Sequence, residues 1–318
     1  MQRRFFLAAS GAGLALGAAR VAAADDPSDY LGPRMPYTRF DALPAHTLTL
    51  DKTAIRVAIV PPDAHPGPAA ILDWVRRSAG AIARYYGRLP TDAIRVLVLG
   101  MRGDGVQGTT WGYRGPATRL RLGGDVTPAM LADDWVLVHE MVHMATPSLP
   151  EDNVWLAEGL ATYIEPIARA QAGIKTIDSV WLEMVQGMPK GEPADGDRGL
   201  DRTHTWARTY WGGALFCLQL DVEIRRRSGN RRGLQDGLRA IVAAGGSNAD
   251  DWAPQRLLAA IDQATGVAAA TALYEAQRAT AVQVDLDDLF RRLGVAVRDE
   301  VVTLDDRAPL AAARRAIV

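Results

Sequence analysis

Residues 139–158 read H-E-M-V-H-M-A-T-P-S-L-P-E-D-N-V-W-L-A-E. His139 and His143 are four positions apart, so on a helix their side chains project from one face, one turn above the other. Two imidazoles in that arrangement can both bind one Zn²⁺ ion, at nitrogen–zinc distances of about 2.0–2.1 Å. Glu140 lies one step round the helix from His139, near the water that such a metal would hold. The stretch therefore predicts a metal site with a proton acceptor beside it.

A third protein ligand is expected downstream, because a catalytic zinc usually has three protein ligands and one position open to water. Pro147 and Pro150 break the first helix. Ser148 and Glu151 have the spacing of a capping box, which predicts the start of a second helix. That helix contains Glu158. Two antiparallel helices joined by a short turn would direct the Glu158 carboxylate back toward the histidine pair.

The same stretch resembles the gluzincin metallopeptidases and is most similar to their M1 and M61 aminopeptidase families. H-E-M-V-H is followed here by W-L-A-E-G-L-A-T-Y-I-E, and the second helix of those families reads roughly W-L-x-E-G-[FL]-[AT]-x-Y. The resemblance implies one Zn²⁺ per chain bound by His139, His143 and Glu158, with Glu140 as the general base. The alternative is a buried pair of histidines that holds no metal.

A second matching segment lies farther along the chain. The run R-T-Y-W-G-G-A-L-F-C is similar to Y-x-K-G-A, which opens a helix in M1 and M61 enzymes and whose tyrosine hydroxyl stabilises the oxyanion. The resemblance implies this role for Tyr210, with a core tyrosine as the alternative. Gly212 stands where the families often have lysine, so the helix entry or a charge interaction can differ. The resemblance covers roughly residues 105–295 and is sharp only over 139–165 and 208–228.

The order of the predicted elements indicates an α+β fold. The chain has 318 residues, of which 48% are hydrophobic, enough for one large domain or two lobes. Alternating β-branched residues predict strands over 47–60 and 94–99, and helical periodicity predicts a helix over 68–86. Residues 108–124 read as a hairpin. With the metal helix that follows, this is a zincin-like catalytic domain: a mixed sheet plus helix lobe carrying H-E-x-x-H, followed by a mainly helical lobe.

We expect the two lobes to meet at the metal helix. Residues 46–145 are predicted to form the α/β lobe that ends in this helix, which we expect to begin at Thr127. Residues 146–318 are predicted to form the mainly helical lobe that carries Glu158 and Tyr210. Residues 25–45 are proline-rich and aperiodic, which indicates an extended arm. The Gly/Pro/Asp-rich stretch 187–204 is the most plausible loop for a hinge or a rim.

Several residues near the motifs have possible supporting roles. In gluzincins the edge strand just upstream of the zinc helix binds the substrate backbone by strand addition. Either arm of the predicted hairpin can serve in this way, with Trp111 or Tyr113 lining a side-chain pocket; a plain sheet hairpin is the alternative. Thr162 lies one turn beyond Glu158 and can hydrogen-bond this ligand, or simply pack against a neighbouring helix. Pro166 is expected to bend or end the second helix.

Residues 1–24 have the features of an export signal. A charged start precedes a short apolar stretch and a small-residue cleavage site before Asp25. The adjacent Arg3 and Arg4 resemble a twin-arginine signal, and an ordinary secretory signal is the alternative. The apolar stretch is too short to span a membrane. We therefore expect a periplasmic or secreted protein without a stable membrane span.

Net charge and the few remaining cysteine and histidine residues limit the partners and further sites that we expect. A net charge of −1 gives no reason to expect nucleic acid or an acidic membrane as partner. Cys217 is the only cysteine, so an intramolecular disulfide is impossible, and its apolar surroundings indicate a buried, inert thiol. His46, His65 and His204 lie outside the matched motifs and are interpreted as surface histidines. The sequence does not determine an oligomeric state.

The resemblance implies zinc-dependent hydrolysis of peptide bonds in a peptide or protein substrate, with an aminopeptidase-like specificity. M1 enzymes bind the α-ammonium group of their substrate from a G-x-M-E-N strand, and no such motif occurs here. A periplasmic zinc endopeptidase therefore remains open, as does a non-catalytic peptide-binding module with a gluzincin fold. A metal-buffering protein would need a fourth protein ligand, and the sequence offers no obvious one.

Overall fold

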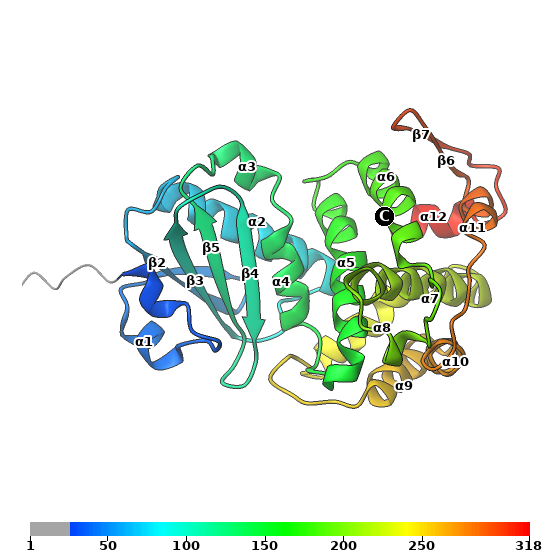
Figure 1. The fold of residues 1–318 in the computed structure, drawn as a ribbon, viewed down its shortest axis with the longest axis horizontal. Helices are drawn as coiled ribbons and strands as arrows, with labels where there is room; N and C mark the ends of the chain where they lie inside the picture. The colour runs from blue at the N-terminus through cyan, green and yellow to red at the C-terminus, as the bar shows by residue number, and fades with distance from the viewer. Residues whose placement is uncertain (1–25) are drawn as a thin grey trace, which may run out of the picture.

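The computed structural model describes residues 26–318, which form a sheet lobe and a helical lobe side by side (Figure 1). The expected export signal, residues 1–24, lies outside the described residues. The predicted fold class is confirmed, because a mixed five-stranded sheet with helices is followed by a region built mainly from helices. The strands of this sheet are β1 (His46–Leu50), β2 (Thr53–Val60), β3 (Ala93–Met101), β4 (Val106–Trp111) and β5 (Ala117–Gly123).

The sheet places β4 at the edge that faces the helical lobe (Figure 1). Its strand order is β1-β2-β3-β5-β4, with β2, β3 and β5 parallel. The outer strands β1 and β4 run antiparallel to their neighbours. The predicted hairpin is therefore confirmed as the pair β4–β5. An edge strand leaves one row of backbone N–H and C=O groups unpaired, which is the requirement for strand addition.

Both faces of the sheet are buried, because alternate residues of its central strands are apolar on each side. On one face β2 packs against α2 (Pro68–Tyr86), the helix predicted over 68–86. On the other face β2 and β3 pack against the segment before β1. The prediction of an extended arm for residues 25–45 is wrong over the described part of this segment. The segment forms a 3-10 helix, Pro27–Tyr30, and helix α1 (Tyr37–Ala42). Its aromatic side chains cover apolar sheet surface that would otherwise face water.

The helix that carries His139 and His143 is shorter than the sequence predicts. The chain forms α3 (Pro128–Ala132), turns, and then starts α4 (Val136–Met144). The Asp134 carboxylate lies at this break, where it accepts hydrogen bonds from the Leu137 amide and the Trp74 indole, both at 3.1 Å. A carboxylate that binds a first-turn N–H group caps a new helix. The single helix expected here is therefore divided in two by this polar contact.

The second helix of the motif is α5 (Val154–Gln171), and it packs against α4 and against α7 (Gly213–Ser228). The sequence predicts that Pro166 bends or ends this helix. Pro166 does not end the helix, because α5 continues for five residues beyond it. Pro166 is buried. Packing of the apolar face of α5 offsets the one backbone hydrogen bond that the proline cannot make.

Helices dominate the rest of the chain, together with one small hairpin. Among residues 26–318, no helix combines the length and the apolar character that crossing a membrane requires. The remaining helices and strands are α6 (Ile177–Gly187), α8 (Leu234–Ala243), α9 (Pro254–Thr265), α10 (Ala270–Gln277), α11 (Leu286–Leu293), β6 (Val295–Arg298), β7 (Val301–Leu304) and α12 (Ala311–Ile317). Short turns of 3-10 helix lie at Glu151–Asn153, Met188–Gly191 and Leu200–Arg202.

Candidate active site

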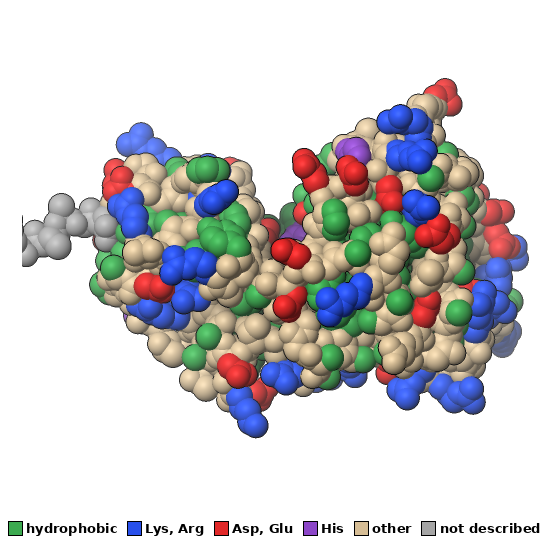
Figure 2. Space-filling model, turned by 90° about the horizontal axis from the view of Figure 1, so that it is seen from below, with side chains coloured by type: hydrophobic (Ala, Val, Ile, Leu, Met, Phe, Trp, Pro, Cys, Tyr) green, Lys and Arg blue, Asp and Glu red, His purple; other side chains and the backbone are tan. Residues whose placement is uncertain are grey.

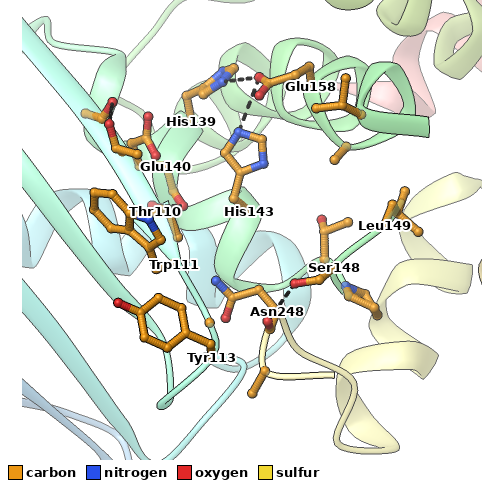
Figure 3. Close-up of a pocket in the computed structure, with 18 of the residues that line it drawn as sticks. Thr110, Trp111, Tyr113, His139, Glu140, His143, Ser148, Leu149, Glu158 and Asn248 are labelled. Atoms are coloured by element: carbon orange, nitrogen blue, oxygen red, sulfur yellow. Dashed lines mark hydrogen bonds and ion pairs between the residues drawn. The ribbon is translucent and has the colours of Figure 1, made fainter. Parts of the chain in front are cut away.

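Three side chains from two neighbouring helices converge between the lobes. The Oε2 atom of Glu158, on α5, lies 3.2 Å from Nε2 of His139 and 3.3 Å from Nε2 of His143, both on α4 (Figure 3). One ligand atom from each of the three residues lies within 4.8 Å of the others. Two imidazole nitrogens and one carboxylate oxygen are a donor set that zinc prefers. The spacing-based prediction that these residues meet therefore agrees with the structure, and the group can hold a metal ion.

The electrostatics of this group show strong coupling between the carboxylate and the imidazoles. Burial by itself would raise the pKa of Glu158, but hydrogen bonds from His139 and His143 outweigh it and leave that pKa well below its ordinary value. Burial would lower the pKa of His143, yet its hydrogen bond to Glu158 and the nearby carboxylates leave it raised. Without metal, the carboxylate therefore stays ionised and His143 holds its proton more tightly than a free imidazole does.

Glu140 lies on the other side of His139, between α4 and the edge strand β4 (Figure 3). Its side chain is buried, and its Oε2 atom has no hydrogen-bond partner among the described residues. Gly108 on β4 makes this position possible, because a Cβ atom there would lie 2.4 Å from Cγ of Glu140. An unpartnered buried carboxylate oxygen is costly unless a ligand or a water satisfies it. Glu140 therefore lies beside the histidine pair with one carboxylate oxygen that no other described residue binds, and this oxygen is available to accept a proton.

Tyr210 lies on a π-helical turn, Arg208–Gly212, that leads directly into α7. π-Helical turns are rare and are frequently found at functional sites. The Tyr210 ring stacks on His139, with 6.2 Å between ring centroids and 19° between their planes. Burial, and next the negative charge of Glu158, raise the pKa of Tyr210 to about 12. Its hydroxyl therefore keeps its proton at neutral pH and can donate a hydrogen bond.

These residues line one cleft of about 710 Å³. Figure 2 shows the hollow between the two lobes, with acidic side chains on the helical lobe beside it. The edge strand β4 forms one wall of the cleft, and Trp111 and Tyr113 line it, as the sequence predicts. The other lining residues are Gly108, Thr109, Thr110, Gly112, Thr146, Pro147, Ser148, Leu149, Val154, Ala157, Asn248, Ala249 and Asp251.

A segment of the helical lobe touches the sheet lobe at one end of this cleft. Ser148 does not cap a helix as its spacing suggests; its hydroxyl donates to the backbone carbonyl of Asn248, at 2.8 Å. The backbone N–H of Asn248 in turn donates to the backbone carbonyl of Met144, at 3.1 Å. The Asn248 backbone also contacts Gly112, where a Cβ atom would lie 1.7 Å from its carbonyl oxygen. The segment therefore forms the wall of the cleft beyond the end of β4.

The structure also places the residues that the sequence suggested only weakly. The Thr162 hydroxyl makes no hydrogen bond to Glu158 and has no partner among the described residues, so of its two alternatives the hydrogen bond to that ligand is not seen. His46, His65 and His204 are exposed, in agreement with the surface interpretation. A 2.7 Å ion pair between two buried side chains, Asp197 in the stretch 187–204 and Arg208 in the π-helical turn, holds that stretch against the turn.

Sequence reasoning missed Gly108, Gly112 and Asn248. Neither glycine belongs to a motif that predicts chemistry, and both matter only because of what approaches them in space. Asn248 lies 100 positions after Ser148, its hydrogen-bond partner. The one sequence signal for this wall was the glycine spacing in G-T-T-W-G, which marks close backbone approach in a strand.

Comparisons with known proteins support the fold. The sequence matches no protein-family model and no curated protein. The structure is similar to an aminopeptidase N family protein from Idiomarina loihiensis, with a TM-score of 0.60 and 13% identity over 80% of this chain and 50% of that one. It is also similar to an M1 zinc metallopeptidase mutant from Deinococcus radiodurans bound to a Tyr-Ser-Ala substrate, with a TM-score of 0.50 and 16% identity over 76% of this chain and 53% of that one.

Identities this low establish a shared fold, and the chain spans about half the length of these relatives. One structural neighbour is thus an aminopeptidase N family protein and the other an M1 zinc metallopeptidase. What the present chain binds and does has to be argued from its own residues.

Proposed function

We propose that this chain is a zinc-dependent peptidase in which His139, His143 and Glu158 hold the metal. The observation that carries the proposal is the convergence of these three donor atoms within 4.8 Å, beside the unpartnered oxygen of Glu140. A zinc ion bound there would polarise the scissile carbonyl and bring the pKa of a water molecule toward about 7. The gluzincin-type fold of its structural neighbours supports the same function.

Protein groups carry out proton transfer, oxyanion stabilisation and binding of the peptide backbone. Glu140 takes the proton of the attacking water and later delivers it to the leaving amine, a role for which its carboxylate is positioned and not otherwise hydrogen-bonded. Tyr210 donates from its hydroxyl to the oxyanion that develops on the carbonyl oxygen. The free backbone groups of β4 hold the peptide in an extended form along the cleft wall.

The proposed specificity is that of an aminopeptidase. The segment around Asn248 packs against Gly112 and forms a wall of the cleft beyond the end of β4, and we propose that this wall limits how much peptide extends in that direction. Apart from Glu140 and Glu158, Asp251 is the carboxylate that lines the cleft, and it lies on the same segment. An α-ammonium group bound near it would select the end of a chain. The edge strand itself carries no acidic residue, so an endopeptidase is the second candidate.

Three measurements on the purified protein test this function. Metal analysis is expected to find one zinc per chain, and peptide cleavage is expected to stop when a chelator is added. The Glu140→Gln variant is expected to keep its zinc and to lose cleavage by roughly 10²- to 10⁴-fold, the usual share of a general base. Cleavage by this variant at the parent rate would remove Glu140 from the mechanism. Zinc binding without cleavage of any peptide would favour the non-catalytic peptide-binding module.

One substrate pair separates the two specificities. The same peptide is offered with a free and with an acetylated N-terminus. Acetylation removes the α-ammonium group, so it blocks an aminopeptidase and leaves an endopeptidase unaffected. Cleavage of both forms at equal rates would decide for the endopeptidase.

We also propose that the protein is exported to the periplasm or secreted. This rests on the sequence of residues 1–24, with Arg3 and Arg4 ahead of a short apolar stretch. Mass spectrometry of the protein from fractionated cells is expected to find a chain that begins near Asp25 outside the cytoplasm. An uncleaved chain in the cytoplasm would contradict export.

A further inference from the structure

A second cavity, of about 240 Å³, adjoins the metal group on the side of Tyr210. We propose that it is a specificity pocket for an uncharged aromatic side chain, carried by the substrate residue next to the scissile bond. This inference rests on the proposed peptidase function, and it names a feature of the substrate that the metal group alone does not determine. Three tryptophans, Trp135, Trp206 and Trp211, form its walls together with His139 and Tyr210.

The position of this cavity links it to the reaction. His139 and Tyr210 line both the main cleft and the second cavity, so the two spaces meet at the metal group. The main cleft extends from there along β4 toward Trp111 and Asn248. A peptide that crosses the metal group therefore has the cleft on one side of its scissile bond and the aromatic cavity on the other.

The cavity walls are aromatic surfaces already arranged around the reacting groups. The Trp135 ring meets His139 edge to face, with centroids 5.6 Å apart and 87° between planes. The Trp206 ring stacks on Tyr210, with centroids also 5.6 Å apart. Both indoles are unusually open to solvent, at 52% exposure for Trp135 and 63% for Trp206. Large exposed aromatic side chains beside a catalytic group indicate a surface that is covered when a ligand binds.

The third tryptophan is held rigidly at the back of the cavity. A Cβ atom on Gly187 would lie 2.0 Å from Cζ3 of the Trp211 ring, and one on Gly191 would lie 2.3 Å from the Trp211 backbone carbonyl carbon. Both positions must therefore be glycine for Trp211 to fit. A wall fixed in this way is pre-organised, which lowers the entropy lost when a side chain binds.

The two carboxylates of the cavity are already paired with cations that lie outside its lining. Glu165 pairs with Arg169 at 2.9 Å. Glu183 pairs with Lys175 at 2.8 Å.

The last charged group lining the cavity, the Lys190 ammonium, lies 5.6 Å from the centroid of the Trp211 ring. A cation over an aromatic face is stabilised by it. Because both carboxylates are paired, the cavity offers no free negative counter-ion to a cationic side chain, which would lose its hydration on entry. An uncharged aromatic ring gains contact on every wall.

Peptide binding tests the inference independently of turnover. The zinc-loaded Glu140→Gln protein is titrated calorimetrically with alanine-based peptides in which one residue, scanned along the chain, is phenylalanine, lysine or glutamate. At one position phenylalanine is expected to improve affinity by roughly 10- to 100-fold over alanine, the effect of burying a large apolar side chain. Lysine is expected to give no gain at that position, and phenylalanine is expected to bind more tightly than glutamate.

Tryptophan variants in the same background locate the effect. Trp206→Ala is expected to bring the phenylalanine-to-alanine affinity ratio close to one, and Trp206→Phe to restore most of it. Trp252 is the matched control, because it is a partly exposed tryptophan outside both cavities, packed under Arg256. Trp252→Ala is expected to keep the parent ratio. Equal loss of the ratio in both alanine variants would overturn the inference, as would tighter binding of the lysine peptide.

The two proposals fail in different ways. A phenylalanine preference in binding, in a parent protein that cleaves no peptide, would uphold the aromatic pocket and reject the peptidase. Cleavage of peptides with no preference for an aromatic residue on either side of the cut would uphold the peptidase and reject the pocket. No binding of any peptide would reject both.

Discussion

Gly159 and Gly213 meet backbone to backbone where α5 packs against α7. A Cβ atom on Gly159 would lie 2.3 Å from the carbonyl carbon of Gly213, and one on Gly213 would lie 2.7 Å from the Gly159 Cα atom. Glu158 directly precedes the first glycine, and Tyr210 lies three residues before the second. The contact between the glycines therefore sets how close the proposed metal-ligating carboxylate comes to the proposed oxyanion donor.

Alanine at either glycine is expected to force the two helices apart. We predict that Gly159→Ala and Gly213→Ala each lower the free energy of unfolding by about 1–3 kcal/mol, the usual cost of overpacking, and lower peptide cleavage as well. Urea unfolding measures the first effect. Gly80, in α2, is the matched control, since a Cβ atom there meets nothing within 4 Å. Gly80→Ala is expected to stabilise by about 0.5–1 kcal/mol. A Gly159→Ala protein as stable as the parent would contradict the close contact.

The contact between Gly108 and Glu140 gives a second prediction. Because a Cβ atom on Gly108 would overlap the Glu140 side chain, Gly108→Ala displaces the proposed general base without touching the metal ligands. We expect the variant to keep one zinc per chain and to lose roughly tenfold or more in kcat, out of the 10²- to 10⁴-fold that a general base contributes. Steady-state kinetics with metal analysis check both parts.

The neighbouring exposed residue, Gln107, supplies the control for this experiment. It lies on the same strand and does not line the cleft. Gln107→Ala is therefore expected to match the parent in both zinc content and kcat. If it loses as much activity as Gly108→Ala, the loss reflects damage to β4 rather than displacement of Glu140.

Tyr210→Phe removes a hydroxyl and keeps the ring that stacks on His139. If the hydroxyl donates to the oxyanion, the change lowers kcat by roughly 10²- to 10³-fold and leaves KM and zinc content close to those of the parent. Burial and the charge of Glu158 raise the pKa of Tyr210 to about 12. The donor therefore keeps its proton across the neutral range, and its ionisation does not shape the pH–rate profile there. A rise in KM with unchanged kcat would instead assign Tyr210 to substrate binding.

Sequence patterns correctly predicted the elements whose formation depends on residues close together in the chain. Helix α2 begins at Pro68 and ends before Gly87, which has the left-handed conformation that glycine favours at a helix end. The hairpin β4–β5 and the approach of Glu158 to the histidine pair also follow from spacing. Pairs four apart on a helix and a short turn between helices leave little choice of geometry.

The errors arose where distant residues decide the local structure. The aromatic residues before β1 show no periodicity, yet they bury themselves on the sheet, so the expected arm is a covering layer. The break before α4 depends on Trp74, which lies 60 positions from Asp134. The cleft wall at Asn248 is likewise defined by contacts with Gly112 and Ser148. A pattern read along one stretch contains no information about such partners.

The hydrogen bonds of Glu158 imply that zinc binding depends on pH. In the metal-free protein Glu158 bonds both histidines, and this interaction outweighs burial and raises the pKa of His143 above 6.5. The proton on His143 must leave before its nitrogen can bind zinc. As the pH falls below that raised pKa, the apparent zinc affinity is expected to decrease by about tenfold per unit for this one proton.

Glu158→Gln tests the origin of this pH dependence. The amide carries no negative charge, so the pKa of His143 falls and the proton competes with zinc only at lower pH. We therefore predict that the variant binds zinc more weakly at neutral pH, because it has lost a charged ligand, while its affinity starts to decline at a lower pH than that of the parent. Competition with a chromophoric chelator, from about pH 8 to about pH 5, measures both quantities around the ordinary histidine pKa of about 6.5. An identical onset in parent and variant would mean that Glu158 does not set the proton affinity of the site.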